Sequence, residues 1–104
     1  MLREVWICAL LVTAGSAGLA QAGGEATYKA QCAMCHGETG KGDTPVGKAL
    51  QAKSLTDPEV MKASEVTLIG QIKNGSAKMP AFKDKLSNAQ IDDVVAYIRS
   101  LEKK

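Results

Sequence analysis

Two cysteines and the single histidine of this 104-residue chain stand within five consecutive positions, Cys32-Ala33-Met34-Cys35-His36. Residues three and four positions apart share one face of a helix, so both thiols and the imidazole would point the same way. The Cys-x-x-Cys-His spacing is that of c-type haem attachment. Two thiols can add to the two vinyl groups of one porphyrin while the imidazole reaches its iron. The motif therefore predicts one covalently bound haem c, held through Cys32 and Cys35.

Three other uses of the two thiols stay open on the residues alone. A closed zinc site has four ligands, usually Cys or His, and residues 23–104 offer two cysteines and one histidine. A thioredoxin-like dithiol expects a βαβ context, and the sequence has no strand pattern. A disulfide across two intervening residues closes a very small loop and removes little chain entropy. Each of these uses explains less of the sequence than haem does.

The first 22 residues have the pattern of an export signal. An apolar run covers residues 5–19, and Ala20-Gln21-Ala22 is a small-x-small cleavage pattern. Glycines interrupt the run, which is shorter than the ~20 residues that span a bilayer, so a cleaved signal is favoured over a retained anchor. Cleavage would remove Cys8 and leave one domain, residues 23–104. Haem attachment of this type happens outside the cytoplasm, and we therefore expect a periplasmic protein.

Composition supports a cofactor in the core and argues against nucleic acid as a partner. The chain has one Trp, two Tyr and one Phe, a thin supply of bulky side chains for a core. Cores below roughly 70–80 residues usually need a staple or a cofactor, and a haem would fill the space. With 13 basic and 11 acidic residues, the net charge of +2 lacks the basic excess typical of nucleic-acid-binding proteins.

The sequence pattern of residues 25–74 predicts helices separated by a long loop. Helical spacing covers residues 25–35, and His36-Gly37 ends that helix. Glycines and a proline punctuate residues 37–55, which predicts a loop. Asp57-Pro58 has the pattern of a short helix start, and a further helix follows over residues 64–74.

The last helix has the clearest sequence signals. Ser87 and Gln90 form a capping box, and Leu86 with Ile91 forms a hydrophobic staple. Apolar residues then recur at helical spacing up to Leu101, which makes a stripe for burial. The sequence therefore predicts a small all-α domain with long loops.

Three segments together resemble the class I cytochromes c of bacteria. They are the attachment motif at 32–37, a loop in which a methionine precedes a proline at 74–82, and the final helix around 94–101. The resemblance covers nearly all of residues 23–104. It implies a small cytochrome c fold in which the N- and C-terminal helices cross around the haem. It also implies His36 and Met79 as the two axial ligands of the iron.

Residues 23–104 contain three methionines that could fill the second axial position. Met34 lies inside the attachment motif, too close to reach the opposite face of the haem. Met61 falls on a short helix, where methionine is more often core filler. Met79 precedes Pro80, which pushes it towards extended backbone and suits a loop that presents a sulfur. This reasoning also favours Met79.

The resemblance implies supporting roles for further residues. A proline carbonyl after the motif accepts a hydrogen bond from the ligand histidine, and Pro45 is the candidate. Gly24 and Tyr28 are expected to cross the last helix at Val94 and Tyr97, as structural contacts.

Phe82 is expected in the wall of the haem pocket. Surface lysines are candidates for a positive ring that steers an acidic partner to the haem edge, with ordinary solvated lysines as the alternative. They are Lys41, Lys48, Lys53, Lys73, Lys78, Lys83 and Lys85.

We therefore expect a monomeric periplasmic cytochrome that carries single electrons between redox proteins and is not an enzyme. Coordination by both His36 and Met79 leaves no open iron position, and no acid, base or nucleophile constellation is visible. The alternative is a five-coordinate haem protein that binds a small gas or reduces peroxide, which needs Met79 to be absent or displaced. A fixed subunit of an oxidase or dehydrogenase is a third possibility.

Overall fold

The structure, a computed structural model, describes residues 16–103, and within them every regular element is helical. The prediction of a small all-α domain is thus confirmed. A 3₁₀ turn, Leu101–Lys103, follows the last helix. In chain order the helices are α1 (Ser16–Gln31), α2 (Ala33–His36), α3 (Pro45–Leu50), α4 (Pro58–Lys62), α5 (Glu65–Asn74) and α6 (Asn88–Ser100).

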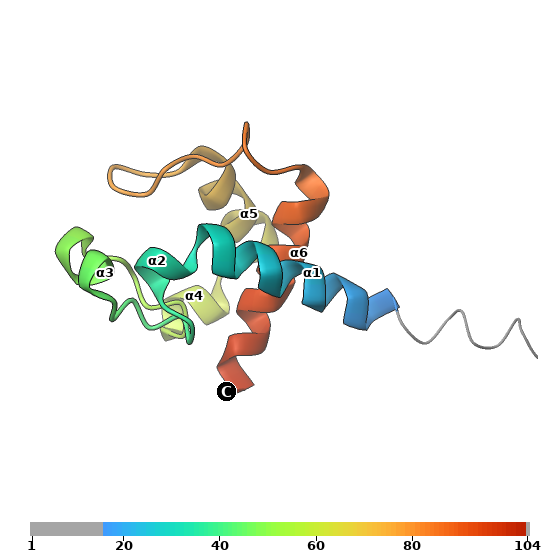
Figure 1. Ribbon diagram of the computed structural model, residues 1–104, viewed down its shortest axis with the longest axis horizontal. Coiled ribbons are helices and arrows are strands. Elements are labelled where there is room, and N and C mark those ends of the chain that lie inside the picture. Colours follow the sequence, from blue (N-terminus) through green and yellow to red (C-terminus); the bar gives the residue numbers. More distant parts are fainter. Residues whose placement is uncertain (1–15, 104) are drawn as a thin grey trace, which may run out of the picture.

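The fold is built around the crossing of α1 and α6 (Figure 1). The Tyr28 and Tyr97 rings meet there, with centroids 5.2 Å apart and planes tilted by 50°. Gly24 is buried at the same crossing, where an added Cβ would run into the backbone carbonyl of Asp93. The expected contact between Gly24 and Tyr28 of the first helix and the last helix is confirmed. A glycine is needed because the two backbones approach within the space of one methyl group.

Gly24→Ala should lower the free energy of unfolding by about 1–3 kcal/mol, because the new methyl group pushes α1 away from α6. Gly70→Ala is the matched control, since Gly70 lies within α5 and an added Cβ there meets nothing within 4 Å. That change should stabilise the protein by up to about 1 kcal/mol through helix propensity. Urea unfolding of both variants measures the difference, and equal effects would contradict the close crossing.

Local capping signals fix the starts of the later helices. Ser87 accepts from the Gln90 N–H at 3.1 Å, and the Gln90 side chain accepts from the Ser87 N–H at 2.8 Å, so the predicted capping box is confirmed. Ser64 caps α5 by accepting from the Thr67 N–H. Pro58 begins α4 as predicted, although the Asp57 side chain makes no capping hydrogen bond.

The predicted loop over residues 37–55 is wrong in its middle, where α3 forms. Thr44 caps this helix through the Gly47 N–H at 2.9 Å, and Pro45 occupies its first turn. The Thr44 hydroxyl also donates to the Met34 carbonyl at 2.6 Å, which ties α3 to α2. Gly47 is buried against the Cys35 carbonyl, so α3 packs directly on the helix of the attachment motif.

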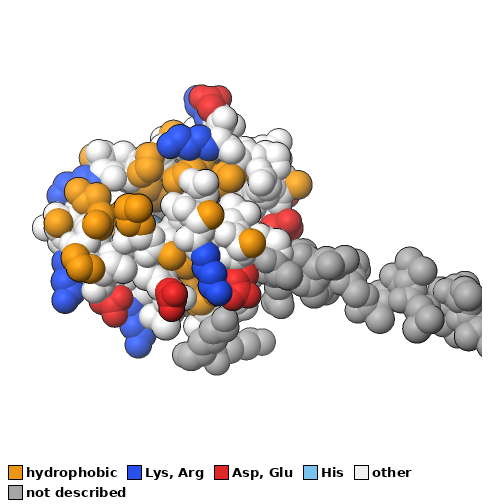
Figure 2. All heavy atoms as spheres, in the orientation of Figure 1, with side chains coloured by type: hydrophobic (Ala, Val, Ile, Leu, Met, Phe, Trp, Pro, Cys, Tyr) orange, Lys and Arg blue, Asp and Glu red, His pale blue; other side chains and the backbone are white. Residues whose placement is uncertain are grey.

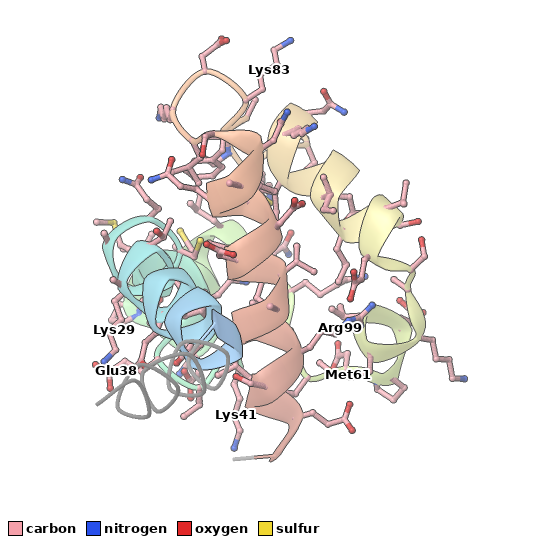
Figure 3. The ribbon with its side chains drawn as sticks, turned by 90° about the vertical axis from the view of Figure 1, so that its right-hand side faces the viewer. Lys29, Glu38, Lys41, Met61, Lys83 and Arg99 are labelled. Carbon is pink, nitrogen blue, oxygen red and sulfur yellow. The ribbon has the colours of Figure 1, made fainter. Side chains whose placement is uncertain are left out.

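Arg99 joins α6 to the end of α4 (Figure 3). Its guanidinium donates to the carbonyls of Val60 at 3.0 Å and Met61 at 2.9 Å, and to that of Ala63. These carbonyls lie at the C-terminal end of α4, where a helix leaves acceptors without intrahelical partners. Arg99 therefore holds α4 in place against the last helix.

Candidate haem site

A cavity of about 480 Å³ opens beside α2, within the range of roughly 300–1,000 Å³ that ligand pockets occupy. Cys32, Cys35, His36 and Met79 all line it. Cys32 lies between α1 and α2, Cys35 and His36 lie in α2, and Met79 comes from the loop after α5. That loop runs above α2 and α3 in Figure 1. The fold therefore brings together the four residues that the sequence singled out.

Cys32 marks a small break between α1 and α2. Its N–H still donates to the Tyr28 carbonyl at 2.8 Å, and the His36 N–H donates to the Cys32 carbonyl at 3.0 Å, so helical geometry continues through the motif. Both cysteines are half-buried free thiols with no disulfide between them. Burial, with a smaller contribution from Cys35, raises the pKa of the Cys32 thiol to about 11. At neutral pH that thiol is protonated and uncharged, which suits an apolar cavity wall.

The histidine is oriented by a backbone carbonyl other than the expected one. His36 Nδ1 lies 2.9 Å from the Lys53 carbonyl oxygen. A carbonyl can only accept, so Nδ1 carries the proton and Nε2 keeps its lone pair for a metal. The expectation that the Pro45 carbonyl fills this role is wrong. Pro45 stands in the first turn of α3, where its carbonyl belongs to the hydrogen-bond ladder of that helix.

Tyr28 supports the other end of the motif. Its ring is fully buried, and its hydroxyl donates to the Gly37 carbonyl at 2.6 Å. Burial raises the pKa of Tyr28 far above its ordinary value, with smaller contributions from Cys32 and Tyr97, so the hydroxyl keeps its proton. The residue that follows His36 is thereby tied to α1.

Met79 is the methionine that lines the cavity. Met34 is 72% exposed, and Met61 lies beside Arg99, away from the lining. The loop that carries Met79 turns at Gly75, which has a φ of 68° and packs against the Met79 carbonyl. The Ser76 N–H donates to that same carbonyl at 2.9 Å. The loop therefore has a defined shape with Met79 facing the cavity side of the molecule.

The rest of the lining is largely apolar and continuous with the core. Phe82 is 5% exposed and belongs to the wall, as predicted. Other core residues on the cavity are Val60, Leu68, Ile72 and Ile98. A cavity with two thiols, an imidazole and a thioether in an apolar wall fits a haem bonded through both cysteines.

The seven lysines do not form one ring around this cavity. Lys53 and Lys78 line it, but Lys53 is already in an ion pair. Lys41 lies near the C-terminal end of α6 and Lys83 lies beyond its N-terminal end (Figure 3). The surface beside the cavity is partly apolar and is not a ring of lysines. Figure 2 shows apolar side chains gathered over α3, and the large exposed ones near the motif are Met34, Val46 and Leu50.

A helical domain with this cavity and this motif is the architecture of a small c-type cytochrome, and comparisons with known proteins agree. Residues 19–98 match the family described as cytochrome C oxidase, cbb3-type, subunit III. A solved structure, the KustC0563 c-type cytochrome, is 32% identical, with a TM-score of 0.70 over 76% of this chain and 96% of that one. The chain belongs to the cytochrome c family, and its cofactor is one covalently bound haem c.

The curated relatives fall into two groups. Cytochrome c6 of Leptolyngbya boryana is 38% identical over 79 residues, which are 76% of this chain and 88% of the relative. Cytochrome c6 of Thermosynechococcus vestitus is 36% identical over 102 residues, 92% of this chain and 88% of the relative. The cbb3-type oxidase subunit CcoP of Azospirillum brasilense is 35% identical over 80 residues. This chain spans only 27% of that subunit's length.

Among residues 16–103, no helix is long and apolar enough to cross a membrane. In the same part of the chain, no group of three or more His, Cys, Asp or Glu side chains is arranged to hold a metal ion.

Proposed function

We propose that this protein is a monohaem electron carrier in which Cys32 and Cys35 hold the haem and His36 and Met79 are the axial ligands. The observation that carries the proposal is that these four side chains line one cavity although Met79 lies far from the motif in sequence. The bound haem supplies a one-electron couple between ferric and ferrous iron. Redox relatives of similar length, the cytochromes c6, support a carrier rather than an enzyme.

The protein's own residues set how the couple behaves. The Lys53 carbonyl fixes the tautomer and orientation of the His36 ring. A thioether from Met79 favours the ferrous state, which raises the potential relative to other ligands. The apolar wall around Ile72 and Phe82 keeps water away and further disfavours the more highly charged ferric state.

The optical spectrum of the purified protein tests this proposal. Expression with haem-maturation factors should give a haem that stays on the polypeptide in acidic organic solvent. The oxidised protein should show the weak red sulfur-to-iron charge-transfer band, and the reduced protein should not bind carbon monoxide readily. A resting protein without that band that binds carbon monoxide would instead be the gas-binding or peroxide-reducing haem protein.

We further propose that residues 1–22 are a signal removed on export to the periplasm. Residues 1–15 of that segment lie outside the described residues, and the sequence pattern supports the proposal. The intact mass of the exported protein should correspond to a chain that begins at Gly23. A mass that corresponds to the full chain, with Met1 to Ala22 still present, would favour a membrane anchor.

We expect the partners to be other redox proteins that approach where the cavity opens, with the carrier acting as a monomer. Leu50 lines the cavity and is 40% exposed, so it lies at the mouth. Val46, also 40% exposed, and Met34 extend this apolar surface. A partner that docks here would contact apolar side chains, and raised salt would then weaken the docking less than it weakens a lysine-ring contact.

A further inference from the structure

One solvent-exposed hydrogen bond joins two residues that line opposite segments of the cavity rim. Lys78 Nζ donates to Gln51 Oε1 at 3.0 Å, and both residues line the cavity. Lys78 directly precedes Met79, and Gln51 directly follows α3. Among the described residues, this is the hydrogen bond that joins the loop at 75–81 to the segment before α4. The remaining bonds of the loop run to itself or to α5.

Gln51 has a left-handed backbone conformation at the end of α3. With φ 58° and ψ 44°, it is the only non-glycine residue with a positive φ in the described part of the chain. Residues with a side chain rarely adopt this left-handed region, and such outliers cluster at ligand clamps and functional sites. Here the conformation ends α3, and the Gln51 side chain accepts from Lys78 at the cavity rim.

The segment that carries Gln51 also contacts the histidine. Two residues further on, the Lys53 carbonyl accepts from His36 Nδ1. Two backbone hydrogen bonds hold this segment against residues 40–47. The Ala52 N–H donates to the Gly47 carbonyl at 2.8 Å, and the Leu55 N–H donates to the Gly40 carbonyl at 2.6 Å. Residues 51–53 therefore form a strap that touches the His36 side of the cavity through a carbonyl and the Met79 loop through a side chain.

We propose that Gln51 and Lys78 form a latch that keeps the Met79 loop closed, so that the two are positioning residues for Met79. This inference rests on the proposed function, because it concerns how firmly Met79 stays on the iron. An external ligand such as imidazole can take the place of Met79 only when the loop opens. Its apparent affinity is then scaled by the fraction of molecules with an open loop.

The test is an imidazole titration of the oxidised, haem-loaded protein, followed by the loss of the red sulfur-to-iron band. In Gln51→Asn, the asparagine tolerates the left-handed backbone, but its side chain is too short to reach Lys78. In Lys78→Met, the methionine keeps an apolar side chain but lacks the ammonium donor. Each change should tighten apparent imidazole binding roughly three- to tenfold, the effect of one modest hydrogen bond on the open fraction. Without added imidazole, the band should remain in both variants.

Three further variants separate a latch from a general structural effect. Gln51→Glu keeps an acceptor for Lys78 and should bind imidazole like the wild type. Lys83→Met removes the same charge from a lysine that lies beyond the N-terminal end of α6 and outside the cavity lining, and it should change binding less than about twofold. The double variant of Gln51 and Lys78 should bind no more tightly than either single one, because both changes break the same bond.

The outcomes distinguish the latch from the function on which it rests. A wild-type protein that lacks the red band overturns Met79 ligation itself. A wild type with the band, combined with Gln51 and Lys78 variants that titrate like Lys83→Met, overturns the latch alone. Single effects that multiply in the double variant also overturn it, since independent contributions mean that the two side chains do not act on each other.

Discussion

Met79→Ala should abolish the red sulfur-to-iron band of the oxidised protein and lower its reduction potential. Loss of the thioether removes the ligand that favours ferrous iron, and axial ligands span ~0.8 V in haem proteins, so a fall on the order of 0.1 V or more is expected. The vacated position should also let the reduced protein bind carbon monoxide. Potentiometric titration and the optical spectrum measure both effects.

Met61→Leu is the matched control for that experiment. Met61 lies beside Arg99 and away from the cavity lining, so a change of similar volume should leave band and potential intact. The stability cost should stay under about 1.5 kcal/mol. If Met61→Leu removed the band while Met79→Ala kept it, the second ligand would be Met61.

Replacing both Cys32 and Cys35 with alanine should give a chain that neither keeps haem in acidic organic solvent nor folds cooperatively. Without haem, the apolar residues around the cavity of about 480 Å³ lose the contacts that the cofactor supplies to a small core. A typical stability is only about 5–15 kcal/mol, so the loss of these contacts is expected to abolish cooperative folding. Circular dichroism during urea unfolding checks the result.

The single variants Cys32→Ala and Cys35→Ala provide the comparison. Each keeps one thiol for attachment and the His36 imidazole, so each should retain haem through one bond and stay folded with reduced stability. A double variant that is helical and unfolds cooperatively at normal stability would show that the haem is not the core of this protein.

Local signals in the sequence predicted the parts of the fold that depend on local chemistry. The capping box at Ser87 and Gln90 needs only residues three apart, and it forms as expected. The crossing of α1 and α6 was predicted from the family resemblance, and Gly24 explains it physically. By contrast, α3 was missed, because its Thr44-Pro45 start stands among glycines that indicate a loop. A cap residue followed by proline was the available signal.

Residues of the candidate site could be singled out from the sequence where side-chain identity carries the proposed chemistry. Cys32, Cys35, His36 and Met79 are recognisable by residue type and spacing, and the fold places all four on one cavity. The hydrogen-bond acceptor of His36 was predicted wrongly as Pro45, because every residue has a carbonyl that could accept. Only the path of the backbone determines that the Lys53 carbonyl lies beside the ring. The hydrogen bonds from Arg99 to α4 were not predicted for the same reason, since their acceptors are backbone carbonyls.

The pairing of α1 with α6 determines the order in which this protein can assemble. The attachment motif is complete once residue 36 has been synthesised, whereas the helix that buries Tyr28 begins at residue 88. Long-range pairing cannot begin until both partners exist, and closing so long a loop makes it a late event. Cys32 and Cys35 therefore stay on a segment without its α6 partner for most of the time that the chain takes to emerge. Haem can therefore be attached to the thiols before the last helix closes the fold over them.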